Sequence, residues 1–121
     1  MPVEIISEEL GLLVVYSGIV TMEDVTVGLK VTWEHPDVDR HRYQILDFRE
    51  TEELLVDESD AAVTGYMDNS AFQDKKMMIA IVTTRSPFAK LCQIYLDSLD
   101  DEYTTGKIFD DMTSARQWID T

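Results

Sequence analysis

The order of apolar segments along the chain is the feature that most limits its fold. Short runs typical of buried strands, such as LLVVY at 12–16 and MMIAIV at 77–82, alternate with segments whose apolar residues recur at helical spacing. Strands separated by helices need crossover connections, and crossovers place strands parallel in a sheet that helices cover. The pattern therefore predicts an α/β domain.

We expect the element order ββαβαβαβα. The first two strands are joined tightly near Glu8 and Glu9, so they add an antiparallel hairpin to parallel strands, and the result is a mixed five-stranded sheet with about four helices. The expected strands are 3–8, 10–18, 42–48, 76–84 and a short one around Ile108. The expected helices run from Thr21, which can cap the first, to Pro36, which ends it, then over 60–72, 85–99 and 112–119.

Each expected helix has an apolar stripe that should face the sheet. The predicted inward residues are Met22, Val25, Leu29 and Trp33 in the first helix, Ala62, Val63, Tyr66 and Met67 in the second, Phe88, Leu91, Cys92, Tyr95, Leu96 and Leu99 in the third, and Ala115, Trp118 and Ile119 in the last.

Length and charge restrict the class of protein. The 121 residues suit one domain over 1–121, and a net charge of −14, from 24 acidic and 10 basic residues, disfavours nucleic acid and anionic membranes as partners. We interpret the acidity mainly as the mark of a highly soluble surface. The alternative, which is more specific, is that the acidic surface binds a basic protein partner. The single cysteine, the lack of a signal-peptide pattern and the lack of a membrane-spanning run lead us to expect a cytoplasmic protein. The oligomeric state, a dimer included, stays open.

Ser59 stands where the second helix is expected to begin. One hypothesis is a phosphorylation switch, since a phosphate is favoured at a helix N-terminus. Asp57, Glu58 and Asp60 surround Ser59, however, and no Lys or Arg lies within five residues of it, so a phosphate there meets repulsion. We therefore favour the other interpretation, in which Ser59 or Asp60 caps the helix.

Four stretches give the chain a family resemblance: GLLVVYSGIVTMEDV, the strand ending in ILDF, MMIAIVTT, and KIFDDMTSARQWI. Together they resemble STAS domains, and more closely the SpoIIAA-like branch that is sometimes grouped as STAS/Sec14-like and is related to anti-sigma-factor antagonists. The resemblance spans nearly the whole chain and rests mostly on core residues. It implies a fold and, from the known members, a bacterial regulatory module that binds other proteins.

The resemblance also implies a site. Antagonists of this group carry an Asp at a strand end and then Asp-Ser-Ser-Gly at a helix start, where a serine is phosphorylated by a partner kinase. Asp47 matches the strand-end Asp, and Asp57, Glu58 and Ser59 stand in the place of Asp-Ser-Ser. Glu58 replaces the first serine and Asp60 replaces the glycine, so the chain departs from the pattern at the modified position.

A second candidate site follows the expected strand 76–84. Thr84, Arg85 and Ser86 offer hydroxyls, a positive charge and a helix N-terminus at the carboxyl end of a parallel strand, where α/β sheets bind small anions. The simpler interpretation is that Ser86 caps the helix and Arg85 is solvated. Because both loops should leave the same edge of the sheet, we expect this segment and the Ser59 segment to share one rim.

The remaining constellations predict little chemistry. His35, Asp37, Asp39 and His41 are metal-ligand types, but they share one irregular loop, and we predict no metal site there. Cys92 lies on an apolar stripe, where a thiol is inert. No serine or cysteine has a histidine at recognisable spacing, so we expect no catalytic residue, no cofactor and no enzyme activity.

We predict a non-enzymatic regulatory module that binds a protein, with Asp57 to Thr64 as its contact surface. The alternative is a carrier or sensor of a small apolar ligand between helices and sheet, which the Sec14-like name of the branch suggests. The residues expected to line such a pocket are Met67, Met77, Met78, Met112, Phe72, Tyr66, Tyr95 and Trp118.

Overall fold

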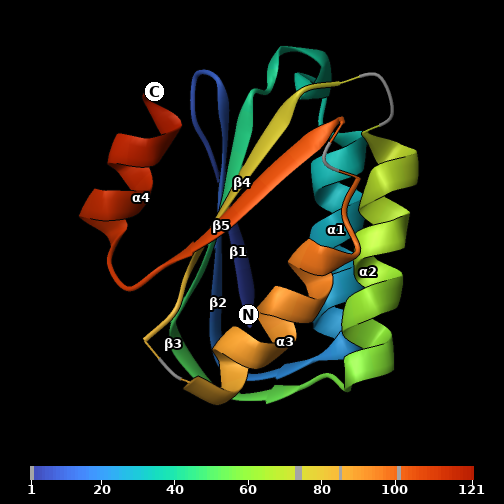
Figure 1. Cartoon of the computed structure of the whole chain (residues 1–121), viewed down its shortest axis with the longest axis vertical. Coiled ribbons are helices and arrows are strands. Elements are labelled where there is room, and N and C mark those ends of the chain that lie inside the picture. The colour runs from blue at the N-terminus through green and yellow to red at the C-terminus, as the bar shows by residue number, and fades with distance from the viewer. Residues whose placement is uncertain (1, 73–74, 85, 101) are drawn as a thin grey trace.

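The computed structural model describes residues 2–72, 75–84, 86–100 and 102–121, and of Ser86 only the backbone. One sheet has the strand order β1-β2-β3-β4-β5, in which β1 and β2 are antiparallel and each later pair is parallel. Helices α1, α2 and α3 cover one face, called here the inner face, and α4 lies on the outer face (Figure 1). The predicted α/β class, with a mixed five-stranded sheet and the order ββαβαβαβα, is confirmed.

The element bounds fix which residues each connection presents. The strands are β1 (Val3–Ser7), β2 (Gly11–Thr21), β3 (Tyr43–Leu55), β4 (Met77–Val82) and β5 (Thr104–Phe109). The helices are α1 (Met22–Glu34), α2 (Glu58–Ala71), α3 (Ser86–Asp97) and α4 (Met112–Ile119), with one 3₁₀ turn, η1 (Val38–Arg40).

Two apolar cores lie on either side of the sheet. The inner core is the larger, and its fully buried members include Leu12, Val14, Ile79 and Ile81 on the strands. In the outer core, Ala115 and Ile119 of α4 pack on Ile45, Ala80 and Val82. The predicted faces of the third and fourth helices are confirmed, because Phe88, Cys92, Tyr95, Leu99, Ala115 and Ile119 are all buried.

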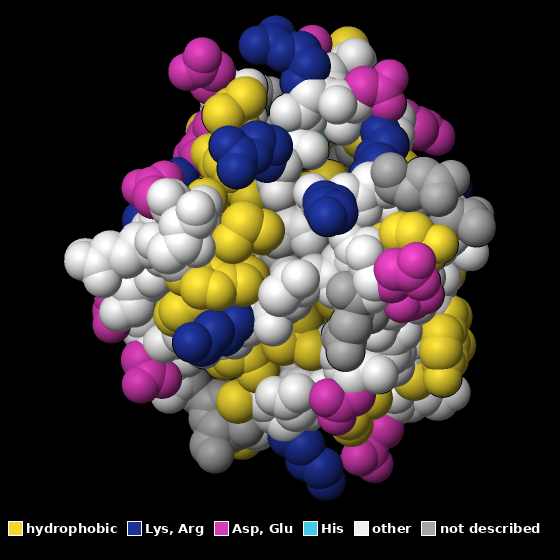
Figure 2. Space-filling model, turned by 45° about the horizontal axis from the view of Figure 1, so that its top comes forward, with side chains coloured by type: hydrophobic (Ala, Val, Ile, Leu, Met, Phe, Trp, Pro, Cys, Tyr) yellow, Lys and Arg dark blue, Asp and Glu magenta, His cyan; other side chains and the backbone are white. Residues whose placement is uncertain are grey.

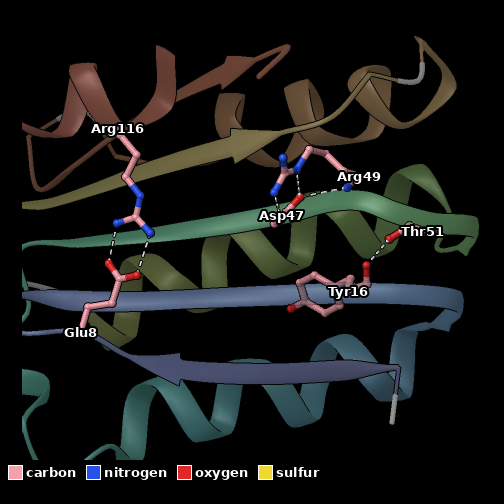
Figure 3. A network of polar contacts seen from close by, with 6 residues as sticks. All are labelled: Glu8, Tyr16, Asp47, Arg49, Thr51 and Arg116. Carbon is pink, nitrogen blue, oxygen red and sulfur yellow. Dashed lines mark hydrogen bonds and ion pairs between the residues drawn. The ribbon is translucent and has the colours of Figure 1, made fainter. Parts of the chain in front are cut away.

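Strand β3 is much longer than the predicted strand 42–48, because it continues to Leu55 through the acidic stretch that lies between that strand and the helix predicted over 60–72. Register shifts relative to β2 break the alternation of side chains that marks a strand in a sequence. Gly18 accommodates one shift with a φ of 67°, which favours glycine. The Thr51 hydroxyl donates to the Tyr16 carbonyl (2.9 Å), and the Asp47 carboxylate accepts from the Arg49 amide (3.0 Å), so side chains stabilise the irregular backbone (Figure 3).

The long strands β2 and β3 outrun their neighbours. Pairing of β3 with β4 ends at Asp47 and Val82, and pairing of β2 with β1 ends at Tyr16 and Val3. Residues 17–21 and 50–55 therefore form a two-stranded extension of the sheet, called here the ribbon, which leads into α1 and α2.

The predicted inner face of the second helix was wrong. The residues of α2 that are buried are Ala61, Thr64, Gly65 and Asp68, whereas Val63 is 48% and Tyr66 62% exposed. Compared with the prediction, α2 is rotated about its axis. Gly65 packs closely against α3, and the Asp68 carboxylate accepts hydrogen bonds in the interior, so the side with these residues faces inward. Apolar periodicity misjudges a helix whose buried side includes a carboxylate, a threonine and a glycine.

Helix α4 is held against the sheet by contacts with a residue near the N-terminus. The Arg116 guanidinium binds both carboxylate oxygens of Glu8 at 2.6 and 2.7 Å (Figure 3), and the Tyr43 hydroxyl donates to the same carboxylate at 2.5 Å. The Arg116 guanidinium lowers the pKa of Glu8. These contacts position α4 on the sheet, since an eight-residue helix is not stable in isolation.

Candidate functional site

The two segments predicted to share a rim do lie at the same end of the molecule. Residue 57 follows β3 and residue 84 follows β4, and both parallel strands end at the edge of the sheet shown at the bottom of Figure 1. The Lys90 ammonium of α3 lies 3.6 Å from the Glu58 carboxylate of α2, so the first turns of these helices are neighbours. We call the first turn of α2 with its capping residue, Asp57 to Asp60, the acidic rim.

The cap of α2 is neither Ser59 nor Asp60. Helix α2 begins at Glu58, and the Asp57 carboxylate accepts from the Asp60 amide at 2.7 Å while the Asp60 carboxylate accepts from the Asp57 amide at 3.3 Å. This reciprocal capping box stabilises the helix start. The prediction failed because an Asp caps as well as a Ser, and the sequence offers three candidates in four residues.

Ser59 is left with its side chain exposed in the first turn of α2. No hydrogen bond involves its hydroxyl within the described residues, and the first-turn amides lie beside it. Lys90 adds a positive charge close to Glu58, which the search for basic neighbours in the sequence missed because Lys90 comes from another helix. Both side chains of that ion pair are largely solvent-exposed, so it contributes about 1 kcal/mol or less to stability.

Beyond the acidic rim, the solvent side of α2 carries apolar residues. Ser59, Val63 and Tyr66 are spaced as i, i+4 and i+7, which puts them on one stripe, and all three are exposed. An exposed valine and tyrosine next to carboxylates make a mixed apolar and acidic surface. Aromatic residues of this kind are enriched in protein interfaces.

The second predicted segment is only partly described. Thr84 is exposed, and Thr83 before it is buried. Arg85 and the side chain of Ser86 lie outside the described residues, so the predicted anion site and the Ser86 cap stay predictions.

A buried carboxylate links the three helices of the inner face. Asp68 of α2 is 1% exposed and accepts a hydrogen bond from Trp33 Nε1 of α1 at 2.9 Å and another from the Tyr95 hydroxyl of α3. Burial raises the pKa of Asp68 to about 6, although both hydrogen bonds act in the opposite direction. Sequence analysis missed this residue because an Asp inside a helix is normally solvated.

A small pocket between the helices and the sheet is lined in part by this carboxylate. Its volume is about 70 Å³, and its lining includes Tyr16, Leu54, Asp68, Cys92 and Tyr95. Of the eight residues predicted to line an apolar pocket, Tyr95 lines this one, whereas Met77, Met78 and Trp118 line a separate hollow together with the charged Arg42, Lys76 and Glu102. Ligand pockets are commonly about 300 Å³ or larger. The small volume of the first pocket and the charged lining of the second do not favour an apolar ligand carrier.

Two groups with reactive side chains are held in unreactive settings. Cys92 is 6% exposed, and burial raises its pKa to about 12, so the thiol stays protonated at neutral pH. His41 is 6% exposed, and burial, followed by the charge of His35, lowers its pKa. Both His41 nitrogens lack a hydrogen-bond partner among the described residues.

The predicted ligand types around His41 do not converge on one point. His35 Nδ1 accepts from the Asp37 amide at 3.0 Å, its Nε2 contacts the Ser7 hydroxyl at 3.0 Å, and Asp39 pairs with Lys75 at 2.5 Å. Within the described part of the chain, no group of three or more metal-ligand side chains is assembled. Likewise, no described helix is long and apolar enough to cross a bilayer.

The sheet order, the three helices on one face and the strand-to-helix rim define a SpoIIAA-like fold, and comparison with solved structures confirms it. A DUF3478-family protein with a SpoIIAA-like fold from Shewanella loihica PV-4 matches with a TM-score of 0.59 at 16% identity, over 97% of this chain and 91% of that one. The anti-sigma factor antagonist SpoIIAA in its unphosphorylated form matches with a TM-score of 0.61 at 12% identity, over 98% and 94%.

At these identities the likeness concerns the fold. No family model matches the sequence, and no curated protein matches it.

Proposed function

We propose that this chain is a bacterial, cytoplasmic STAS-type regulatory module that works by binding another protein through the acidic rim and the adjoining solvent side of α2. The predicted surface from Asp57 to Thr64 is narrowed to its exposed residues up to Val63 and extended to Tyr66, because Ala61 and Thr64 are buried. The observation that supports it most directly is the exposure of Val63 and Tyr66 on the stripe of Ser59. Apolar side chains bordered by carboxylates suit a partner with a basic rim around an apolar patch.

Catalysis is not part of the proposal. The Cys92 thiol is buried and protonated. His35 contacts the Ser7 hydroxyl at 3.0 Å, but this contact is exposed, and neither residue lines the pocket described above. The SpoIIAA likeness adds an analogy, because the antagonist named in that comparison acts on a protein factor.

Photo-crosslinking tests the surface. A photoreactive amino acid at Ser59 or Tyr66 should capture a partner from lysate of the native host, and the capture should fall at high salt because screening weakens attraction between charges. The same group at Gln117, which is exposed on α4, serves as the control. Equal capture from all three positions, or none from Ser59 and Tyr66, would contradict the proposal.

Phosphorylation of Ser59 is the regulatory part of the proposal. With Asp57 as the cap, the Ser59 hydroxyl is exposed in the first turn, where amides favour a phosphate. The modification adds about two negative charges to the acidic rim. Mass spectrometry of the protein purified from its host should detect a phosphopeptide containing Ser59, and its absence under all growth conditions would exclude the switch.

A further inference from the structure

The outer face of the ribbon exposes two aliphatic side chains. Ile19 is 53% and Leu55 56% exposed. Ile19 is paired with Glu53 and Thr21 with Leu55, and paired residues in a ladder point to the same face of a sheet, so Ile19 and Leu55 are diagonal neighbours. The intervening Val20 is fully buried on the inner face.

This outer face is largely uncovered in the described chain, since Ile19 and Leu55 are both more than half exposed. Parallel strands are usually buried on both faces. Helix α4, the outer-face helix, packs on β4 and β5, and its core partners do not include ribbon residues. The ribbon thus lacks the outer layer that its strand type normally has.

The charges around the aliphatic pair are negative. Glu50 is paired with Ser17 and Glu53 with Ile19, and both glutamates are exposed. Arg49, next to Glu50, binds the Asp47 carboxylate through Nε at 3.0 Å and through its terminal nitrogen at 2.9 Å (Figure 3). That pairing places the positive charge of Arg49 on the Asp47 carboxylate, and the same charge also attracts Glu50. The three carboxylates of Asp47, Glu50 and Glu53 nevertheless outnumber this one cation, so the surroundings of the aliphatic pair keep a net negative charge.

We propose that the outer face of the ribbon is a docking site for a cationic amphipathic helix of a partner protein. Apolar side chains of that helix would cover Ile19 and Leu55, and its Lys or Arg side chains would face Glu50 and Glu53. Charge argues against a second copy of this chain as the occupant, because each copy carries a net charge of −14. The ribbon's outer face is on the side of the sheet away from α2, so this inference goes beyond the proposed function.

A model peptide tests the site directly. The probe is a synthetic peptide with Leu at i, i+3 and i+4 spacing and Lys elsewhere, and the control probe has the same composition in scrambled order. In an NMR titration, saturable shifts should concentrate at residues 17–21 and 50–55. By calorimetry, Ile19→Ser/Leu55→Ser should bind the peptide about tenfold more weakly, because two partly exposed aliphatic side chains lose their apolar contacts.

A matched control separates this site from general hydrophobic attraction. Val27 and Val31 on α1 are 43% and 41% exposed, so Val27→Ser/Val31→Ser removes a comparable apolar surface elsewhere and should keep wild-type affinity. If Ile19→Ser/Leu55→Ser fails to fold, Glu50→Gln/Glu53→Gln provides a second route, and it should weaken binding and flatten its salt dependence.

Three results would overturn the proposal: shifts centred away from the ribbon, equal weakening by the α1 control, or no binding. A dimer in sedimentation that Ile19→Ser/Leu55→Ser dissociates would instead assign this face to a second copy. Crosslinking from Ser59 probes the other side of the sheet, so either proposal can fail without the other.

Discussion

At the scale of single residues, Asp68 is the side chain with the clearest energetic consequence. Its carboxylate is buried between three helices, and the contacts found for it come from neutral donors, Trp33 and Tyr95. The pKa of Tyr95 is raised well above its usual value, by burial and by the neighbouring Asp68 charge, so its hydroxyl stays a donor. Ionised Asp68 is therefore hydrogen-bonded but has no opposite charge in these contacts, which lowers stability at neutral pH.

We expect Asp68 to make the protein less stable as pH rises from about 4 to about 7. An Asp in an unfolded chain titrates near 3.9, whereas the pKa of Asp68 in the fold is about 6, so the folded state binds more protons in this window. The free energy of unfolding should fall by up to about 3 kcal/mol across it. Urea denaturation at several pH values should show this slope in the wild type and not in Asp68→Asn.

The exposed Asp120→Asn should keep the wild-type slope. The idea fails if Asp68→Asn and wild type show parallel pH profiles, because the carboxyl would then titrate alike in both states.

Residue roles were the least predictable level of this protein. The acidic surroundings of Ser59 follow from the sequence, but the role of Asp57 as the cap depends on the residue at which the helical backbone begins. Asp68 and Gly65 have meaning only in relation to α1 and α3, which are distant in sequence. Lys90 near Glu58 is another contact between helices that local patterns cannot reveal.

At the scale of elements, the contact between α2 and α3 depends on a missing side chain. A Cβ at Gly65 would lie 2.5 Å from the Ser98 Cβ and 2.7 Å from the Tyr95 carbonyl oxygen. Asn69 also donates to the Ser98 carbonyl at 2.8 Å. The two helices therefore approach at a distance that only glycine permits at this position.

Gly65→Ala should destabilise the protein although alanine favours helices. The clash costs about 1–3 kcal/mol by overpacking, against about 1 kcal/mol gained in helix propensity, so the expected net loss is about 1 kcal/mol. Thermal or urea unfolding measures it, and Ser70→Ala on the exposed side of α2 should be neutral or slightly stabilising. A Gly65→Ala protein more stable than wild type would refute the close approach.

Element types were predictable from apolar spacing, whereas element lengths were less so. Helices α1, α3 and α4 and strand β4 follow one regular period each. Strand β3 extends seven residues beyond its predicted end. The prediction stopped too early because extra residues at the register shifts leave consecutive glutamates exposed, which breaks the alternation expected of a strand. When the alternation of apolar and polar residues shifts by one position inside a strand, the sequence alone suggests a loop, and only pairing with the neighbouring strand reveals the strand.

At the scale of the whole molecule, the net charge of −14 is a property of the surface and does not determine the α/β fold. The face in Figure 2 shows acidic and basic side chains interspersed, with hydrophobic side chains visible between them. The chain has 24 acidic and 10 basic residues, and the described residues form four ion pairs, Glu8–Arg116 and Asp39–Lys75 among them. Acidic residues therefore outnumber the cations that could pair with them. The excess charge repels itself in the compact state.

Added salt should therefore stabilise the fold. Raising NaCl from about 0.01 M to about 0.5 M shortens the screening length several-fold, and we expect the Tm to rise by about 5 °C, which corresponds to about 1 kcal/mol. Differential scanning calorimetry at constant pH checks this, and a neutral osmolyte of matched osmolality separates screening from water exclusion. A falling Tm would show that attractive pairs outweigh the repulsion.

The bond between Glu8 and Arg116 spans 108 positions of the chain. A ribosome must therefore add Arg116 before the outer layer can close, while the strands and helices of the inner layer are already synthesised. Until α4 has been synthesised, the apolar residues on the outer face of β3 and β4 stay uncovered, and exposed apolar surface of this kind favours aggregation.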